Sequence, residues 1–439
     1  MRYILWNKPL QGAFPKGPIQ YMAFFLTIFL YSFMFLILYF QVFLVLTFVE
    51  SRPEILDTDP YKLFKERKDK PSVTIIVPVW NEEKTVVKTV HSLLELNYPK
   101  DRLFIMVVDD GSKDNTWNVV QQFQGNPQVL LHQKQNGGKY TALNYAIEHA
   151  TSEFIGCLDA DSFVDDEALN HIIPHFTDPQ IMAVTPSLKI QNPDTVLGLI
   201  QNAEYNMGIF IRKILGFLDA QYVTPGPFSI FKKEVFNTVG VYRHAHNTED
   251  LEMALRLQEH HYRIVNAHRA VVYTVGPRTL YKLYKQRVRW TGGFIQNTID
   301  YKQMLLNPKY GNLGMLVLPI AMYSMVATLI FLAYNAYSFI KTISGSIERI
   351  QVTGFHPTFT LPSYSWDYLL YNVQTSLILA LMGVGVVVFS IWYGKRMAGV
   401  KDDNSIDIVL FLLIYSLISP LWLIASAYNT LRRRDAAWR

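Results

Sequence analysis

The sequence predicts an α/β domain with a mostly parallel sheet, flanked by transmembrane and interfacial α-helices. Three observations predict this. Apolar residues gather in long runs near both ends of the chain, and the region between the runs alternates strand-like and helix-like segments. Of the 439 residues, 50% are hydrophobic and only 18% are charged, whereas soluble domains have about 25% charged residues. This composition excludes a disordered chain, a collagen-like fibre and a simple cytosolic enzyme.

Four apolar runs are long enough to cross a bilayer, which takes about 20 apolar residues in a helix. The first run also exceeds the apolar part of a signal peptide, which has about 7–15 residues. The others exceed the usual length of a buried core helix. We therefore expect transmembrane helices at residues 20–49, 313–342, 367–393 and 405–429, with an N-terminal segment at 1–19 and a basic tail at 430–439.

The region between the first two runs has a soluble composition and roughly 200 residues, enough for a core of its own. It follows a charged, proline-containing linker at residues 50–71. Expected strands at 73–79, 103–109, 129–132 and 154–158 alternate with expected helices at 82–96, 114–123 and 139–150. This order predicts a mostly parallel sheet with helices on both faces, and ligands then bind beyond the carboxyl ends of the strands.

Two pairs of acidic residues follow directly on apolar strands. The second strand ends in Asp109-Asp110, and the fourth is followed by Asp159-Ala160-Asp161. Parallel strands end at one edge of a sheet, so we expect the four carboxylates to lie together, where they need a cation. Oxygen ligands suit Mg²⁺ or Mn²⁺ rather than zinc, and the period of a strand would point Asp159 and Asp161 the same way. Each pair alone could also simply cap the following turn.

Glycine and lysine residues before the third helix fit an anionic ligand. Asn136-Gly137-Gly138-Lys139 precede it, and a helix N-terminus favours phosphate, although Gly-Gly-Lys alone is more often only a turn. The chain has no Walker A motif, and no Gly-x-Gly-x-x-Gly follows the first strand, which disfavours an ATPase or a dehydrogenase. The single cysteine, Cys157, excludes a disulfide scaffold and stands beside no evident base.

Two further motifs lie towards the second apolar run. Asn247-Thr248-Glu249-Asp250 precedes apolar residues at helical spacing, so it can cap a helix while a first-turn carboxylate faces the cleft. Gln286-Arg287-Val288-Arg289-Trp290 lies in a stretch that mixes aromatic and basic residues. That stretch predicts amphipathic interfacial helices at residues 279–312.

Four motifs in this order, Val-Asp-Asp-Gly-Ser, Asp-Ala-Asp, Thr-Glu-Asp and Gln-Arg-Val-Arg-Trp, resemble those of the membrane-embedded processive β-glycosyltransferases of family 2. That group includes the cellulose, chitin-oligosaccharide, hyaluronan and poly-N-acetylglucosamine synthases. The resemblance covers residues 72–297 and the flanking spans, and it implies a cytosolic GT-A-like domain at residues 72–278. One segment departs from the pattern: Thr224-Pro225-Gly226-Pro227-Phe228 stands where such synthases often carry a Cys-Gly-Ser/Thr-like segment, so acceptor recognition is expected to differ.

The resemblance implies a role for each matching residue. The residues implied to bind the nucleotide sugar are Asp110, Asp109, Lys139, Pro78 and Glu82. Those implied to hold Mg²⁺ or Mn²⁺ are Asp161, as the direct ligand, and Asp159. The implied general base is Asp250. Those implied to hold the diphosphate and the acceptor sugar are Gln286, Arg289, Trp290 and Glu249.

The implied reaction is an inverting transfer of a sugar from a UDP-sugar to the end of a growing β-linked polysaccharide, coupled to its translocation. N-acetylglucosamine is the favoured sugar. The expected partners are the donor, a polysaccharide or lipid acceptor and the bilayer, with no nucleic acid and with accessory subunits left open. A non-processive glycolipid transferase stays open, because ceramide glucosyltransferases carry a related Gln/Arg-x-x-Arg-Trp signature. A transporter is disfavoured, because its ionisable residues would lie at the membrane midplane.

The resemblance implies a multi-pass protein of the plasma membrane. One span before the cytosolic domain and three after it place both termini outside. Lys395, Arg396 and Lys401 fit a cytosolic loop, but Arg432-Arg433-Arg434 after the last run opposes the positive-inside rule. A break at Pro420 would divide the last run into two short helices of a re-entrant pair, and this alternative stays open. We expect no cellulose-type regulatory domain after that run.

Overall fold

The computed structural model describes residues 18–57, 61–67, 69–354, 375–399 and 405–432. Most of the expected N-terminal segment and basic tail, and the start of the expected third span, lie outside these residues. The chain forms two compact units. One consists of residues 1–42 and 323–385, and the other of residues 43–322 and 386–439.

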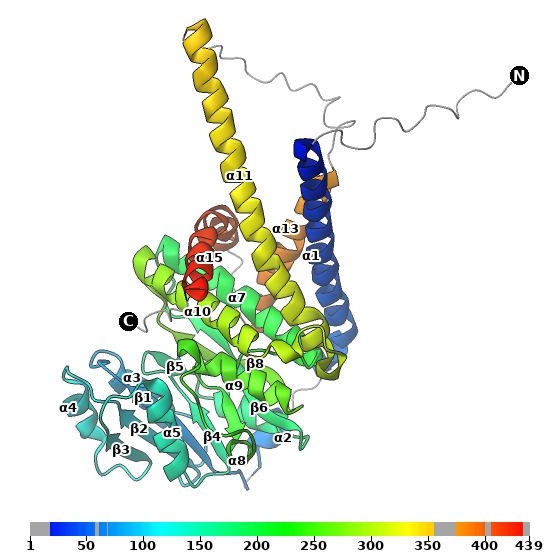
Figure 1. The fold of residues 1–439 in the computed structure, drawn as a ribbon. Coiled ribbons are helices and arrows are strands. Elements are labelled where there is room, and N and C mark those ends of the chain that lie inside the picture. Colours follow the sequence, from blue (N-terminus) through cyan, green and yellow to red (C-terminus); the bar gives the residue numbers. More distant parts are fainter. Residues whose placement is uncertain (1–17, 58–60, 68, 355–374, 400–404, 433–439) are drawn as a thin grey trace, which may run out of the picture. The chain divides into compact units, whose positions relative to one another are not determined.

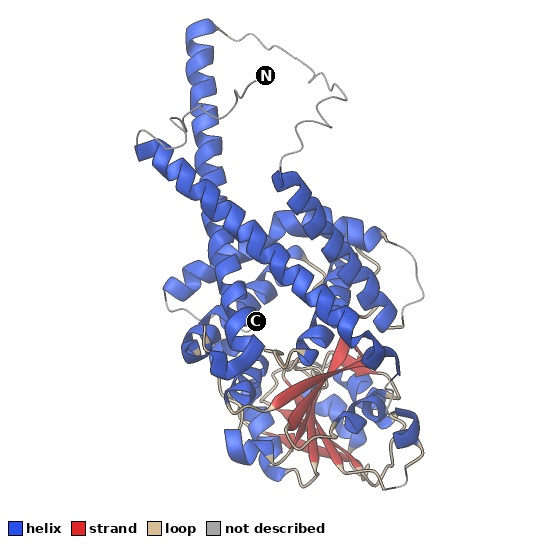
Figure 2. Ribbon diagram, turned by 90° about the vertical axis from the view of Figure 1, so that its right-hand side faces the viewer, coloured by secondary structure: helices blue, strands red, loops and turns tan. Residues whose placement is uncertain are grey.

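One eight-stranded sheet forms the centre of the second unit, as far as its described residues show (Figures 1 and 2). Its strands are β1 (Val73–Val79), β2 (Leu103–Asp109), β3 (Val129–Gln133), β4 (Phe154–Cys157), β5 (Ser162–Val164), β6 (Ile181–Ile190), β7 (Ile230–Lys232) and β8 (Arg263–Thr274). The strand order is β3-β2-β1-β4-β7-β6-β8-β5. β1 pairs in parallel with β2 and β4, β2 with β3, and β6 with β8, whereas β7 runs antiparallel to β4 and β6, and β5 to β8.

The mostly parallel sheet that the sequence predicts is thus confirmed. The four predicted strands correspond to β1 to β4, with ends that differ by one residue at most. β1 is a nearly continuous run of β-branched residues and is buried along almost its whole length, as expected of a central parallel strand. The strands β5 to β8 extend the sheet beyond what the sequence predicted.

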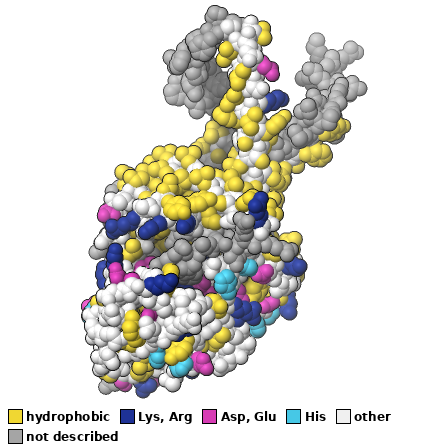
Figure 3. Space-filling model, turned by 60° about the vertical axis from the view of Figure 1, so that its left-hand side comes forward, with side chains coloured by type: hydrophobic (Ala, Val, Ile, Leu, Met, Phe, Trp, Pro, Cys, Tyr) yellow, Lys and Arg dark blue, Asp and Glu magenta, His cyan; other side chains and the backbone are white. Residues whose placement is uncertain are grey.

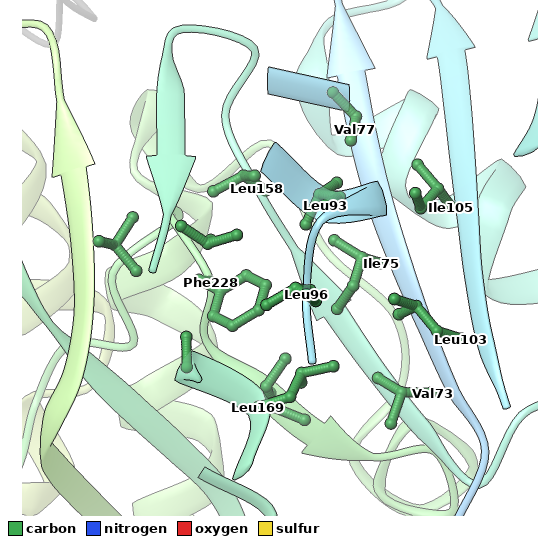
Figure 4. Close-up of a cluster of buried hydrophobic side chains, with 14 of the residues drawn as sticks. Val73, Ile75, Val77, Leu93, Leu96, Leu103, Ile105, Leu158, Leu169 and Phe228 are labelled. Carbon is green, nitrogen blue, oxygen red and sulfur yellow. The ribbon is translucent and has the colours of Figure 1, made fainter. Parts of the chain in front are cut away.

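Short helices cover both faces of this sheet. They are α2 (Tyr61–Lys65), α3 (Val86–Leu94), α4 (Thr116–Val120), α5 (Lys139–His149), α6 (Ala168–Ile172), α8 (Val235–Val239) and α9 (Glu249–Glu259). Side chains on one face, such as Ile75 of β1 and Leu93 of α3, form one hydrophobic core (Figure 4). Side chains on the other face, such as Ile76 of β1 and Leu143 of α5, form a second core. The alternation of side chains along each strand therefore fills both layers.

Two of the predicted helices are shorter than expected. The prediction for residues 82–96 corresponds to α3, which begins only at Val86. The backbone N–H of Glu82 donates to the hydroxyl of Thr116 at 2.8 Å, so the residues before α3 form a loop bound to the start of α4. The prediction for residues 114–123 corresponds to α4 followed by a 3₁₀ turn at Gln121–Phe123.

In the second unit, the long helices α7 (Val196–Phe217) and α10 (Leu280–Asp300) pack beside the sheet domain. So do α15 (Ser416–Leu431) and the short α14 (Ile406–Leu410) that precedes it. The residue Asp407 of α14 accepts from Lys395 at 2.6 Å and from Asn202 of α7 at 3.1 Å. This buried charge is thereby paired, as a charge in an apolar setting must be. On the face shown in Figure 3, hydrophobic side chains gather in one region, and Lys and Arg side chains lie along its border.

Four helical segments are long and apolar enough to cross a membrane, judged by length and composition among the described residues. They are Thr27–Arg52, Leu313–Val352, Leu377–Met397 and Ile406–Leu431. They belong to α1 (Pro18–Asp57), to α11 (Leu318–Thr353) with the π turn before it, to α13 (Thr375–Met397), and to α14 and α15. In the first unit, the ring of Tyr323 packs against Phe29 and Phe33 of α1. Helix α1 continues through Pro53, so the expected linker at residues 50–71 begins as helix.

Candidate active site

The carboxyl ends of β1, β2 and β4 lie at one edge of the sheet, because β1 pairs in parallel with both of the others. The register sets Val79 opposite Asp109 and Ile76 opposite Cys157. Both acidic pairs therefore leave the sheet at the same edge, as the sequence predicts. Their four side chains have different surroundings.

The carboxylate of Asp109 lies inside the fold and is fully buried. One of its oxygens accepts from the N–H of Ser112 at 3.0 Å and from the Ser112 hydroxyl at 2.5 Å. The other accepts from the side chain of Gln133 at 2.8 Å. In this arrangement Asp109 shapes the loop after β2.

The carboxylate of Asp110 holds the glycine loop before α5. It accepts from the N–H of Gly137 at 3.1 Å, from the N–H of Gly138 at 2.8 Å and from Lys134 at 2.7 Å. Gly138 has a φ of +93°, a conformation that glycine adopts without steric cost. The loop amides that could bind a phosphate thus bind a protein carboxylate, and the loop delivers Lys139 to the sheet edge.

The ammonium group of Lys139 lies between two carboxylates. Its nitrogen is 2.6 Å from Asp159 and 3.2 Å from Glu249, the first residue of α9. Burial disfavours the charged form of this lysine, but the negative charges of Asp159 and Glu249 raise its pKa well above the usual value. Lys139 therefore stays a cation and joins the carboxyl end of β4 to the start of α9.

Asp250 stands beside this ion-pair cluster. One of its carboxylate oxygens accepts from the N–H of Leu251 at 2.9 Å. Its backbone carbonyl accepts from the N–H of Thr224 at 3.2 Å and from the Thr224 hydroxyl at 2.7 Å. Desolvation, and next the negative charge of Glu249, raises the pKa of Asp250 to about 6. A carboxylate with this pKa is ionised at neutral pH and is a better proton acceptor than an ordinary aspartate.

A small cavity opens between these groups. The residues that line it are Lys139, Leu143, Cys157, Thr224, Pro225, Gly226, Ser229, Tyr242, Glu249 and Asp250. Burial raises the pKa of the Cys157 thiol far above its usual value, so this thiol stays protonated and is no nucleophile.

The segment around Gly226 belongs to the site, which the sequence motifs alone did not show. A Cβ at Gly226 would lie 2.8 Å from the Lys139 nitrogen and 3.2 Å from an Asp159 oxygen. The backbone at Gly226 thus lies directly against the ion-pair cluster, and a side chain at this position would displace the ends of Lys139 and Asp159. The only signal in the sequence is the departure of Thr224–Phe228 from the family pattern.

Asp159 and Asp161 offer two carboxylates to a cation. Both side chains are partly exposed, and the described residues hold no cluster of three or more His, Cys, Asp or Glu side chains that could ligate a metal ion. Mg²⁺ sites commonly use one or two carboxylates together with phosphates of the substrate. The residues therefore fit a cation that binds together with a nucleotide.

Pro78 and Glu82 are the two remaining candidates for the nucleotide site, and they lie near the end of β1 and before the start of α3. Pro78 is half-buried near the end of β1. It lies two residues beyond Ile76, whose carbonyl accepts from the N–H of Leu158 at 2.8 Å. A proline is tolerated there because no strand pairs with that side of β1. One carboxylate oxygen of Glu82 accepts from the hydroxyl of Thr85 at 2.9 Å.

The structure brings α10 to the loop that carries Asp250. The guanidinium of Arg289 donates to the carbonyl of Asn247 at 2.7 Å, and its positive charge acts on Asp250. Gln286 and Trp290 lie on the same helix and are half-buried. Arg289 thus contacts the segment before the predicted base directly.

Arg287 is a residue of this motif to which the sequence assigned no role. Its guanidinium donates to Glu204 of α7 at 2.6 Å and to Gln286 at 2.8 Å, and it stacks 4.2 Å from the centre of the Trp290 ring. The second carboxylate oxygen of Glu204 accepts from the hydroxyl of Tyr415 at 2.9 Å. Arg287 therefore fixes both Gln286 and Trp290.

Known proteins match parts of this chain. The poly-beta-1,6-N-acetyl-D-glucosamine synthases of Staphylococcus epidermidis and Staphylococcus aureus (strain COL) are 35% and 34% identical to it over 224 residues. Each match covers 50% of this chain and 54% of the relative, so the chain spans about half the length of the curated relatives it matches.

A solved structure has the same kind of fold. The mannosyltransferase PcManGT from Pyrobaculum calidifontis, in complex with GDP-Man and Mn²⁺, aligns with a TM-score of 0.54 and 18% identity over 90% of this chain and 99% of its own. The predicted GT-A-like α/β fold is thereby confirmed. A family model described as glycosyltransferase like family 2 matches residues 71–293, slightly more than half of the chain. The resemblance seen in the sequence motifs is confirmed, and the chain belongs to glycosyltransferase family 2.

Proposed function

We propose that this chain transfers N-acetylglucosamine from UDP-N-acetylglucosamine to the end of a growing β-linked polysaccharide. The observation that carries the proposal is the cluster of Lys139, Asp159, Glu249 and Asp250 at the carboxyl edge of the sheet. It combines a carboxylate of raised pKa with a fixed cation in a family 2 domain. Such a pair suits a reaction in which a hydroxyl loses a proton while a diphosphate leaves.

Asp250 is the general base of the proposed reaction. An acceptor hydroxyl attacks the anomeric carbon of the donor, the bond from that carbon to the diphosphate breaks, and Asp250 takes the hydroxyl proton. Its pKa of about 6 keeps it ionised at neutral pH. No covalent intermediate is needed, which agrees with the protonated state of Cys157.

Positive charge near Asp250 supports the departure of UDP. Arg289 lies within reach of the Asp250 loop, and Lys139 lies in the adjoining ion-pair cluster. Asp161 and Asp159 would hold Mg²⁺ or Mn²⁺, which when bound would offset the charge that grows on the diphosphate. The Pyrobaculum mannosyltransferase was solved in complex with Mn²⁺, which supports testing both ions here.

Trp290 is the proposed contact for the acceptor sugar, since its indole face suits the apolar face of a sugar ring. The stacked Arg287 and its partner Glu204 hold this ring in place. We place Asp110 and Lys134 near the uridine of the donor, with Pro78 and Glu82 at the same edge of the sheet.

The choice of donor and linkage rests on the relatives. The staphylococcal proteins are named as synthases of a β-1,6-linked N-acetylglucosamine polymer. We propose the same sugar, processive elongation and translocation through the membrane for this chain. We further propose a plasma-membrane location with the sheet domain in the cytosol, because UDP-sugars are cytosolic and four helical segments within the described residues could span the bilayer.

The decisive experiment uses the purified full chain in nanodiscs with each of several radiolabelled UDP-sugars and with Mg²⁺ or Mn²⁺. We expect transfer from UDP-N-acetylglucosamine only, and a long product that a β-1,6-specific hexosaminidase degrades. The matched control is Asp161→Asn, which should lose most of its transfer from every donor. Transfer from another UDP-sugar alone would refute the proposed donor, and addition of one sugar to a lipid would favour a glycolipid transferase.

A further inference from the structure

Three consecutive residues before the motif of the proposed base have left-handed backbone conformations. Ala245, His246 and Asn247 have φ values of 46°, 54° and 61°. Side chains with a Cβ disfavour this region, and asparagine tolerates it best of the three. Such a run persists only where the surrounding structure enforces it. It ends directly before Thr248, Glu249 and Asp250.

The enforcing contacts come from one face of α10. Arg289, Gly293, Asn297 and Asp300 are spaced four, four and three residues apart, so they form a single stripe along the helix. We name these four residues the α10 stripe. Each of them meets the segment 245–248.

Three members of the α10 stripe bind this segment through polar groups. The guanidinium of Arg289 donates to the carbonyl of Asn247 at 2.7 Å. The side-chain amide of Asn297 donates to the Thr248 hydroxyl at 2.9 Å and to the Ala245 carbonyl at 3.3 Å. The imidazole of His246 lies 2.9 Å from a carboxylate oxygen of Asp300.

The fourth member, Gly293, acts by its lack of a side chain. A Cβ there would collide with the hydroxyl and methyl groups of Thr248 and would lie 2.9 Å from the Thr248 Cβ. The neighbouring Gly292 differs, since a Cβ there would meet only the Ser426 Cβ, at 3.9 Å. Helix α10 and the segment before Asp250 therefore touch so closely that only glycine fits at position 293.

We propose that Gly293, Asn297 and Asp300 are positioning residues for Asp250. They hold residues 245–247 in the left-handed conformation and thereby set the direction of the first turn of α9. This inference rests on the proposed role of Asp250 as the base. It adds to that role a second requirement, namely that the α10 stripe meets the segment 245–248 correctly.

The test compares Gly293→Ala with Gly292→Ala in the full chain in nanodiscs. Both changes add one methyl group to the same helix, so they have similar effects on helix propensity. The first readout is hydrogen exchange of the Asn247 and Thr248 amides, which bond to the carbonyls of His244 and Ala245. We expect Gly293→Ala to speed this exchange about tenfold or more and Gly292→Ala to leave it unchanged.

The second readout is sugar transfer. Gly293→Ala should lower kcat by about 10- to 100-fold while the affinity for UDP-N-acetylglucosamine changes little, because a small misplacement of a catalytic group costs that much. Gly292→Ala should transfer sugar as the wild type does. Equal exchange and equal kcat in the two variants would overturn the inference, and so would faster exchange with an unchanged kcat.

A second variant covers the case in which Gly293→Ala does not fold. Asn297→Leu keeps the approximate shape of the side chain but removes both donations to the segment. It should also speed the exchange of the Asn247 and Thr248 amides and lower kcat. Wild-type exchange and kcat in a folded Asn297→Leu protein would overturn the inference. If the wild type itself transfers no sugar, the proposed function fails. The comparison of hydrogen exchange still tests the contact between the α10 stripe and the segment 245–248.

Discussion

Replacing Asp250 by asparagine separates the two roles open to this residue. The carboxylate oxygen that accepts from the Leu251 N–H at 2.9 Å has an equivalent in the asparagine amide, and the contacts of Thr224 involve only the Asp250 backbone carbonyl. The substitution Asp250→Asn also removes a negative charge beside Glu249, so it adds no electrostatic repulsion between these two side chains. The folded structure should therefore tolerate Asp250→Asn.

The expected size of the effect follows from these contacts. If Asp250 only supports the first turn of α9, of which it is the second residue, the cost is about 0.3–1 kcal/mol, the usual effect of one negative charge near a helix N-terminus. If Asp250 is the base, its loss should lower kcat by about 10²- to 10⁴-fold. At about 1.4 kcal/mol per factor of ten, that is roughly 3–5 kcal/mol in the barrier of the chemical step.

The assay measures donor affinity and polymer formation on the same nanodisc sample. UDP-N-acetylglucosamine binding should stay near that of the wild type, because the base contacts the acceptor hydroxyl rather than the nucleotide. Polymer formation should collapse. Polymer formation within a few-fold of the wild type would refute the base assignment and leave Asp250 only its place in the first turn of α9.

Three other substitutions test the remaining groups. Asp161→Asn should abolish most turnover and metal-dependent UDP binding without unfolding the protein; full turnover in EDTA would contradict the proposed metal site. Trp290→Ala should lower transfer to sugar acceptors more than UDP affinity, whereas an equal loss of UDP affinity would make Trp290 a packing residue. Transfer should rise with pH through about 6, as Asp250 ionises. Glu249→Gln removes a charge that raises the pKa of Asp250, so the rise of transfer with pH should move to lower pH. An unchanged pH profile would argue against an effect of Glu249 on the pKa of Asp250.

The sequence predicted half of the sheet well, for a physical reason. Strands β1, β2 and β4 are mostly buried, and they and the more exposed β3 have apolar runs, which the sequence pattern detects. Strands β5 and β7 have three residues each, too few for a pattern. β6 contains Pro186, and the register with β8 shifts beside that proline. β8 includes polar residues such as Asn266 and His268, so neither long strand shows the apolar run of β1.

The sequence located the sheet edge of the candidate site but not the contacts made there. Asp109 and Asp110 are adjacent and end the same strand, so no local pattern distinguishes them. Their surroundings come from the end of β3, which supplies Gln133 to Asp109, and from the loop after β3, which supplies the amide of Gly138 to Asp110. The pairing of Glu204 with Arg287 spans 83 positions and likewise leaves no local signal.

The position of Asp250 depends on the packing of α10, beyond the side chains that this helix contributes to the site. One face of α10 contacts the segment before Asp250 through Asn297. Other parts of the same helix contact α15, where the hydroxyl of Ser426 donates to the Val288 carbonyl at 3.1 Å, and α7, where Glu204 binds Arg287. Helix α10 thus connects α7 and α15 to the segment before Asp250. We therefore expect a substitution that loosens the contact between α15 and α10 to shift the proposed base, even though α15 supplies none of the predicted site residues.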